Sequence, residues 1–218
     1  MSTTAQIAAV AALDDSARRA LYDYVCRQPD AVGRDAAAAA LELPRSTAAF
    51  HLDRLVELGL LETEFRRLSG RSGPGAGRPA KLYRRAAREV AVTLPPRDYQ
   101  LAGELLAGAV TRAERTGAPV RAELAALALE MGRRIGAGAG SMADALDEAS
   151  YQPCPDALGG TALANCPFHR LASAHTDLIC EANAALLRGV AEGVDADPAR
   201  VERVAPPPGG CCVRIAAE

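Results

Sequence analysis

Tryptophan is absent from this 218-residue chain, and aromatic residues make up only 4% of it. A core must therefore consist mainly of Leu, Val and Ala, and the Ala-rich runs with Arg rather than Lys favour helices. No apolar run reaches the ~18 residues of a transmembrane helix, which excludes membrane insertion by that route. The N-terminal stretch MSTTAQIAAVAALDDS also lacks the basic start and the distinct cleavage pattern of a signal peptide. These absences predict a cytoplasmic protein.

A strong positive charge is also missing, because the formal net charge is −2. By itself this value argues against a nucleic-acid-binding protein. The charges are unevenly distributed, however: residues 1–95 contain 14 Arg and Lys against 11 Asp and Glu, whereas the remainder contains 11 against 16. The net charge therefore does not exclude nucleic-acid binding, because a basic half is joined to an acidic half.

Residues 43–61, LPRSTAAFHLDRLVELGLL, have the pattern of a helix with one apolar face. Pro44 suits a first helical turn, the stripe of Ala48, Leu52, Leu55 and Val56 can face a core, and Gly59 ends the helix. An ordinary surface helix would show the same pattern. Its neighbours favour DNA binding, because helices from Asp14 or Asp15 to Arg27 and over 34–41, with the turn 42–44, complete a helix-turn-helix. The residues expected to face the major groove are Arg45, Ser46, Thr47, Phe50, His51 and Arg54.

Residues 66–88 contain eight Arg and Lys and no acidic residue, and their Gly and Pro residues exclude a helix. The flanking segments LLETEF and AKLYRR can pair as two strands, which predicts a basic hairpin, the wing of a winged helix. A basic flexible linker is the alternative, but a linker would not need strand-like ends. A mobile cationic loop suits phosphate or minor-groove contacts. The wing residues expected to contact DNA are Arg66, Arg67, Arg71, Arg78 and Lys81.

The rest of the chain predicts a mostly helical α+β protein with a small C-terminal α/β sensor unit. Its elements are a joint at 90–98, helices at 99–115, 119–135 and 142–149, a loop at 136–141, a strand at 161–165, a helix at 176–192, and strands at 199–205 and 211–217. The expected domains are a disordered N-terminus at 1–12, a winged helix-turn-helix at 13–89, a linker with dimerisation helices at 90–148, and a cysteine-containing sensor at 149–218.

Five of the six cysteines follow residue 150, and none belongs to a C-x-x-C pair. In a cytoplasmic protein they are better interpreted as ligands, sensors or buried thiols than as disulfides. Cys166 precedes Pro167 at an expected helix start, where the helix dipole favours a thiolate, and Cys180 lies in the following helix. Strand alternation would send Cys211 and Cys212 to opposite faces. Such thiolates could hold an iron–sulfur cluster, or zinc with a histidine; buried inert cysteines fit the sequence equally well.

Two motifs resemble known regulators. RSTAAFHLDRLVELGLLE with LSGRSGPGAGRPAKLYRR is similar to the ArsR/DeoR-like winged-helix transcriptional regulators, and NCPFHRLA followed by LIC, LLRG and PPPGGCCVRI resembles the iron–sulfur-responsive, SufR-type repressors. The resemblance covers nearly all of residues 13–216. It implies a [4Fe–4S] or [2Fe–2S] cluster on Cys166, Cys180 and either Cys211 or Cys212. Cys154 and His169 are candidates for the fourth ligand.

We therefore expect a homodimeric regulator, as a repressor, that binds a palindromic double-stranded DNA operator and senses redox state through its cluster. One alternative is a winged-helix regulator that senses zinc, a thiol oxidant or a small organic ligand. A remote alternative is an enzyme that uses Cys166 with His169 or His175. No acid that would orient such a histidine is recognisable, and an enzyme does not need a basic wing, so we expect no catalytic activity.

Overall fold

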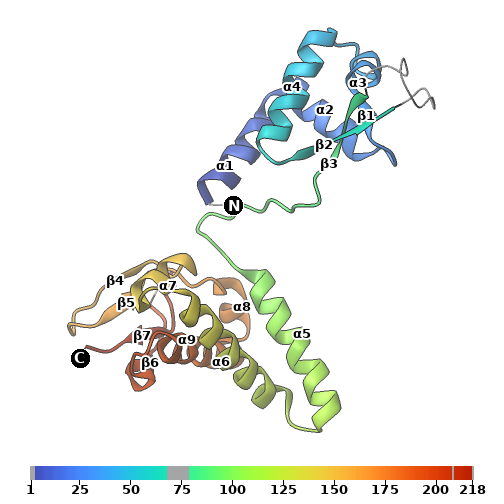
Figure 1. Cartoon of the computed structure of the whole chain (residues 1–218). Helices are drawn as coiled ribbons and strands as arrows, with labels where there is room; N and C mark the ends of the chain where they lie inside the picture. Colours follow the sequence, from blue (N-terminus) through green and yellow to red (C-terminus); the bar gives the residue numbers. More distant parts are fainter. Residues whose placement is uncertain (1–2, 68–78, 208, 218) are drawn as a thin grey trace. The chain divides into compact units, whose positions relative to one another are not determined.

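The computed structural model describes residues 3–67, 79–207 and 209–217, and the chain divides into two compact units, Met1–Val92 and Thr93–Glu218 (Figure 1). The first unit ends three residues after the predicted domain end at residue 89. Both units are mainly helical with short antiparallel strands, so the predicted mostly helical α+β class is confirmed.

Three helices form the centre of the first unit. Asp15 caps the first of them, since its carboxylate accepts a hydrogen bond from the Arg18 backbone N–H at 2.8 Å. Alanines at 37 and 38 are buried and let α3 approach its neighbours closely. Gly59 has a φ of +71°, which suits glycine and ends the third helix as predicted. The helices are α2 (Ser16–Cys26), α3 (Arg34–Ala40) and α4 (Arg45–Glu57), with Pro44 at the N-cap of α4.

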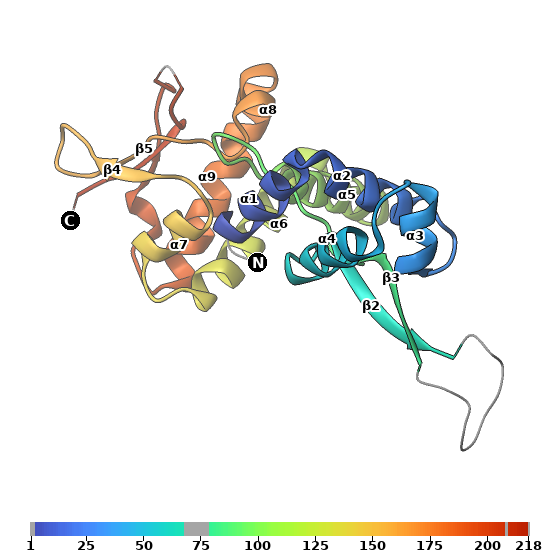
Figure 2. The ribbon, with the colours of Figure 1, turned by 90° about the horizontal axis from the view of Figure 1, so that it is seen from above.

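The predicted wing is present as an antiparallel hairpin of β2 (Leu61–Arg66) and β3 (Ala80–Arg85). All six residue pairs are in register, from Leu61 opposite Arg85 to Arg66 opposite Ala80. A two-residue strand, β1 (Val32–Gly33), pairs with β3 on its other side. Figure 2 shows β2 and β3 side by side, leading away from the helices of this unit.

The N-terminal residues differ from the expectation of a disordered end. Thr3–Ala11 form helix α1, followed by a 3₁₀ turn, η1 (Ala12–Asp14). Ala9 is fully buried in the same core as Leu21 and Leu52. The Ala-rich sequence supports the helix, and this burial supplies the tertiary contact that a short helix needs.

Helices α6 (Val120–Gly138) and α9 (Thr176–Gly193) cross in backbone contact at the centre of the second unit. A Cβ on Gly132 would lie 1.9 Å from the Leu186 carbonyl oxygen, and one on Gly136 would lie 2.3 Å from that of Val190. The glycines are therefore required for this crossing. They also explain why the predicted loop at 136–141 is wrong for residues 136–138: α6 continues through Gly138, because packing against α9 outweighs the low helix propensity of glycine, and the loop is limited to 139–141.

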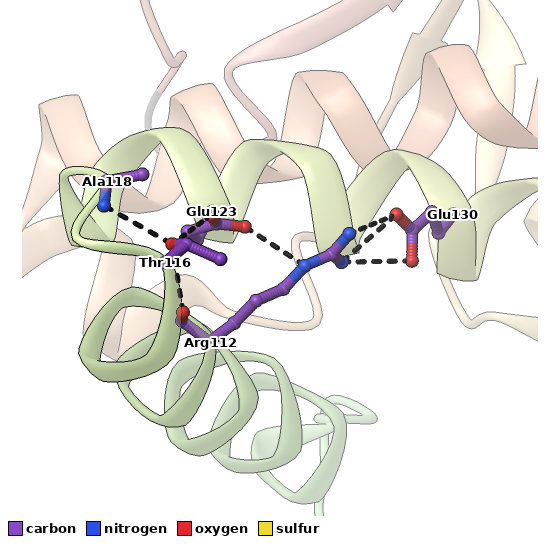
Figure 3. Close-up of polar contacts among 5 residues, drawn as sticks. All are labelled: Arg112, Thr116, Ala118, Glu123 and Glu130. Atoms are coloured by element: carbon purple, nitrogen blue, oxygen red, sulfur yellow. Dashed lines mark hydrogen bonds and ion pairs between the residues drawn. The ribbon is translucent and has the colours of Figure 1, made fainter.

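Helix α5 (Tyr99–Thr116) packs on α6, and one arginine ties the two helices together (Figure 3). Arg112 on α5 binds the Glu130 carboxylate at 3.0 Å, and its Nε lies 3.1 Å from an oxygen of Glu123, both on α6. The Thr116 hydroxyl donates to Glu123 at 2.8 Å and accepts from the Ala118 N–H. The turn between these helices is thus fixed by a connected set of polar contacts.

A four-stranded antiparallel sheet completes the second unit, in the order β4 (Pro153–Pro155), β5 (Thr161–Leu163), β7 (Val213–Ile215) and β6 (Val201–Arg203). Its strand β4 was not predicted from the sequence. One hydrophobic core extends from α5 to this sheet, so the predicted separation of 90–148 from 149–218 is not a structural boundary. Within the described residues, the structure contains no helix with the length and apolar character to cross a membrane. The remaining elements are α7 (Met142–Glu148), α8 (His169–Ala174) and η2 (Pro198–Arg200).

Candidate DNA-binding face and thiol site

Helix α4 buries one face and exposes the other, as predicted. Ala48, Leu52 and Leu55 are fully buried, whereas Val56 is half-buried. The polar side retains cationic tips: Arg45 binds Asp35 at 2.7 Å, and Arg54 binds Glu57 at 2.8 Å. These ion pairs are exposed, so they are weak and can exchange for contacts with DNA. On this side Arg45, Ser46, Phe50 and Arg54 are exposed, and Thr47 is half-buried.

His51 does not lie on this exposed side, so its predicted contact with a base edge is wrong. Its relative exposure is 8%, and its Nδ1 accepts a hydrogen bond from Nε of Arg18 at 3.4 Å. The Nε2 of His51 lies 3.9 Å from the Asp15 carboxylate. Both partners lie at the start of α2, which covers this position of α4. His51 therefore fixes the packing of two helices.

The wing carries exposed cationic residues at the outer ends of its strands. Arg66 and Arg67 are exposed, and Arg66 lies 3.6 Å from Glu64. Lys81 donates to Asp53 of α4 at 2.6 Å, and the Tyr83 hydroxyl donates to the same carboxylate at 2.7 Å. Burial raises the pKa of Asp53, but the hydrogen bonds from Lys81 and Tyr83 outweigh it and lower the pKa overall. Asp53 thus joins the hairpin to the exposed side of α4. Arg71 and Arg78 lie outside the described residues.

Four cysteine side chains from three segments of the second unit meet at one place. The Cys166 thiol lies close enough to Cys211, Cys211 to Cys212, and Cys212 to Cys180 for each to shift the pKa of its neighbour. All four residues are buried. Cys166 precedes α8 and Cys180 lies in α9. The pair Cys211 and Cys212 directly precedes β7. Leu163 and the segment after β6 hold the backbone of this pair: the Cys211 N–H, for example, donates to the Leu163 carbonyl at 3.0 Å.

Cys211 and Cys212 do not lie in a strand, but only one of them, Cys212, lines the pocket. Strand β7 begins only at Val213, and the backbone bends at Cys212. The rule of alternating faces therefore does not apply to the doublet, and the two thiols contact each other. They remain distinguishable, because Cys212 lines a surface pocket and Cys211 lies behind it, where its sulfur accepts a hydrogen bond from Asn183 Nδ2 at 3.2 Å.

The thiols have unequal acidities because they hydrogen-bond to one another. The hydrogen bond from Cys211 lowers the pKa of Cys212 to about 6, and a second hydrogen bond from Cys180 adds to the effect. Burial, followed by the hydrogen bond with Cys212, raises the pKa of Cys180 to about 12. The hydrogen bond with Cys166 raises the pKa of Cys211, and the same bond lowers that of Cys166. A thiolate at Cys212 is thus stabilised by neighbouring S–H donors.

The pocket beside these thiols has a volume of about 220 Å³. Cys166, Cys180 and Cys212 line it together with His169, and the segment 206–207 and Gly209 also belong to its lining. The described lining residues include no carboxylate. The pocket brings three thiols and one imidazole of the predicted ligand set to a common space.

Two other predicted candidates lie elsewhere. Cys154 is in β4 opposite Ala162 and is absent from both the thiol contacts and the pocket lining. His175 is exposed at the N-cap of α9. Cys26 belongs to the first unit, where it is half-buried and hydrogen-bonded to Tyr22, in agreement with a packing role. Of the predicted histidine and extra cysteine ligands, only His169 therefore lies at the pocket.

The four thiols are not arranged in the geometry of a metal-binding site. Within the described part of the chain, no group of three or more His, Cys, Asp or Glu side chains has the geometry to hold a metal ion. The hydrogen bonds between the sulfurs belong to protonated thiols, and ligation would require the thiols to lose protons and turn toward a common centre. The donor set and the adjacent space are present, and the coordination geometry is not.

Sequence reasoning missed a second layer of residues around the thiols. Arg97 donates to the Cys166 carbonyl oxygen at 3.2 Å and also binds the Asn165 side chain. Asn165 is buried and donates to the carbonyls of Pro96 and Ser150 at 2.9 and 2.7 Å. Asn183 accepts from the Tyr151 hydroxyl, which orients its amide toward Cys211. In the sequence, Asn165 directly before Cys166 was the only sign of these supporting residues, and it did not identify Arg97 as its partner.

Comparison with known proteins gives a match in the first unit alone. Residues 13–64 match the family model described as a helix-turn-helix domain. Searches of curated proteins and of solved structures found no match. The matched range contains α2, α3 and α4 and part of β2, the elements that make the candidate DNA-binding face. The match supports a DNA-binding transcriptional regulator with a winged helix-turn-helix.

Proposed function

We propose that this protein is a transcriptional regulator, a repressor, whose affinity for operator DNA depends on an iron–sulfur cluster in its second unit. The observation that carries the proposal is the convergence of Cys166, Cys180, Cys211 and Cys212 beside a pocket. Thiolates are the usual protein ligands of iron–sulfur clusters. Inert cysteines need neither mutual contact nor a pocket, so the placement favours a ligand-binding site over the role of packing thiols.

Cys166, Cys180 and Cys212 are the cysteine ligands in this proposal, because these three line the pocket. His169 is the fourth candidate, since it shares the pocket wall, and Cys211 supports the site from behind. A bound cluster supplies a redox-active and oxygen-sensitive group. The residues that the chain itself contributes are three thiols, one imidazole and the buried Asn183, which holds Cys211.

The segment 93–98, which we call the linker, connects the site to the DNA-binding unit along the chain. Arg97 and Asn165 bind each other, the Asp98 N–H donates to the Pro167 carbonyl at 3.1 Å, and Arg97 reaches the Cys166 carbonyl. A displacement of the Cys166 backbone on ligation would therefore be transmitted to the linker through these hydrogen bonds. This provides a physical route by which the state of the thiol site can bias the DNA-binding unit.

In this proposal the protein acts as a homodimer on a palindromic operator. One recognition helix reads only a few base pairs, and two-fold pairing doubles the number of contacts. Exposed Val110 on α5 and Val120 at the start of α6 lie on the helices predicted to mediate dimerisation.

The test is iron and acid-labile sulfide content after anaerobic purification. We expect both in the wild type and a loss of both in Cys166→Ser, Cys180→Ser and Cys212→Ser. Cys154→Ser and Cys26→Ser serve as controls, because neither thiol lies at the site. Circular dichroism of each variant shows whether the fold is retained. Full iron and sulfide content in the three pocket variants would contradict the proposal.

Zinc is the second candidate, because three cysteines and one histidine are also a common ligand set of structural zinc sites. The same preparations separate the two: a zinc protein is colourless and contains no sulfide, whereas a cluster absorbs in the visible range. A redox sensor without metal would contain neither iron nor zinc.

A further inference from the structure

Phe50 is a large apolar side chain at a place where a soluble helix normally carries a polar one. Its relative exposure is 64%, and it is the sixth residue of α4. Ser46 lies four residues before it and Arg54 four residues after it, so all three share one side of the helix. This is the side predicted to face DNA. The position therefore exposes an aromatic ring between two groups able to form hydrogen bonds with base edges.

The ring of Phe50 packs against the ring of the buried His51. It makes an edge-to-face contact with the His51 ring, with centroids 5.3 Å apart and an interplanar angle of 65°. His51 is in turn held by the Arg18 side chain at 3.4 Å, and it is buried. An exposed side chain that rests on a fixed neighbour loses little conformational entropy on binding. Phe50 is thus presented to a partner in a restrained position.

We propose that Phe50 determines sequence specificity by packing against the 5-methyl group of thymine in the major groove. A phenyl ring can form no hydrogen bond with a base edge, and the thymine methyl is the apolar feature that the major groove displays. Ser46 and Arg54 would then read or position the neighbouring bases through hydrogen bonds. This inference rests on the proposed DNA-binding function and adds the base that one residue recognises.

The experiment starts from duplexes selected from a random library by the full-length protein. Each thymine in the selected site is replaced in turn by uracil, which lacks only the methyl group, and affinity is measured by fluorescence anisotropy. For wild type we expect one thymine in each half-site whose replacement weakens binding about four-fold, the factor that corresponds to ~0.8 kcal/mol for one buried methyl-sized group. In Phe50→Ala this difference between thymine and uracil should disappear.

Phe65→Ala is the matched control. Phe65 is the other strongly exposed phenylalanine, at 66%, but it lies on β2 of the wing. Its removal should leave the four-fold preference for thymine unchanged. Phe50→Leu keeps an apolar contact and should retain part of the preference, and the exposure of Phe50 makes a folding defect in either variant unexpected.

Three outcomes would overturn the inference. Sequence-selective binding with equal affinities for thymine and uracil duplexes would overturn it alone. An unchanged preference for thymine in Phe50→Ala would do the same. A wild type that binds no duplex at all would overturn both this inference and the proposed function.

Discussion

Arg97 and Cys166 are joined by a hydrogen bond of 3.2 Å from the guanidinium of Arg97 to the carbonyl oxygen of Cys166. The bond connects the last part of the linker to the residue that begins the thiol site. Asn165, directly before Cys166, binds Arg97 and the Pro96 carbonyl as well. A shift of the Cys166 backbone would therefore strain the hydrogen bonds that connect it to the linker.

Loss of this connection should uncouple the two functions. In Arg97→Ala we expect an unchanged iron content and a much smaller difference in DNA affinity between cluster-containing and cluster-free protein. Asn165→Ala should act likewise and lower stability by about 1–3 kcal/mol, because it leaves buried polar groups unpaired. Arg121→Ala, which removes an exposed ion pair with Glu181 in the same unit, is the control. Full retention of the affinity difference in Arg97→Ala would contradict the linkage.

The crossing of α6 and α9 predicts a sharp difference between two glycines. Gly132→Ala places a methyl group 1.9 Å from the Leu186 carbonyl and should destabilise the second unit by about 1–3 kcal/mol or more. Gly138→Ala is the matched control, because a Cβ there meets nothing within 4 Å. Thermal unfolding followed by circular dichroism compares the variants. Equal melting temperatures would show that the helices do not approach this closely.

Substitution of Arg54 should change DNA binding, whereas substitution of His51 on the same helix should change stability. Arg54 is exposed, so Arg54→Ala should weaken binding to selected DNA, with about 1–3 kcal/mol of discrimination at stake, and leave stability unchanged. His51 is buried against Arg18, so His51→Ala should lower stability by about 1–3 kcal/mol instead. Thermal melts together with DNA titrations distinguish the effects. A His51→Ala variant with unchanged stability and altered base preference would contradict this and would show that His51 contacts a base.

The thiol site should show unequal reactivity in the reduced, metal-free protein. Because the pKa of Cys212 is lowered to about 6, its thiolate persists down to that pH and is lost only below it. The pKa of Cys180 is raised to about 12, so this residue stays protonated at neutral pH in the same pocket. Mass spectrometry after brief iodoacetamide treatment at pH 7 should find alkylation at Cys212 before Cys180, with a rate that falls below pH 6. Faster alkylation of Cys180 would contradict the assignment.

Local sequence patterns predicted the DNA-binding unit well. The apolar stripe of α4 and the segments LLETEF and AKLYRR define their elements through short-range periodicity, and the structure confirms them. The burial of His51 was not predictable, because it depends on where α2 packs. The helix through Gly136 was missed for a related reason: a glycine-rich run predicts a loop unless the second helix that needs it is known.

For the thiol site, the resemblance to SufR-type repressors identified candidate cysteines but not their arrangement. Strand alternation could not place Cys211 and Cys212, because β7 starts only at Val213, directly after the doublet. Exclusion of Cys154 and the contribution of Arg97 both require the tertiary fold, since sequence separations of 12 and 69 residues from Cys166 carry no information about distance.

Control of DNA binding by the cluster can be measured in one DNA titration on a single anaerobic preparation, before and after the cluster is removed with an iron chelator. We expect the affinity for selected DNA to change by about 5- to 150-fold, the usual range of coupling between two sites, and we expect reconstitution with iron and sulfide to restore the first value. Equal affinities for selected DNA in a preparation that contained iron and sulfide and in the same preparation without them would contradict control by the cluster.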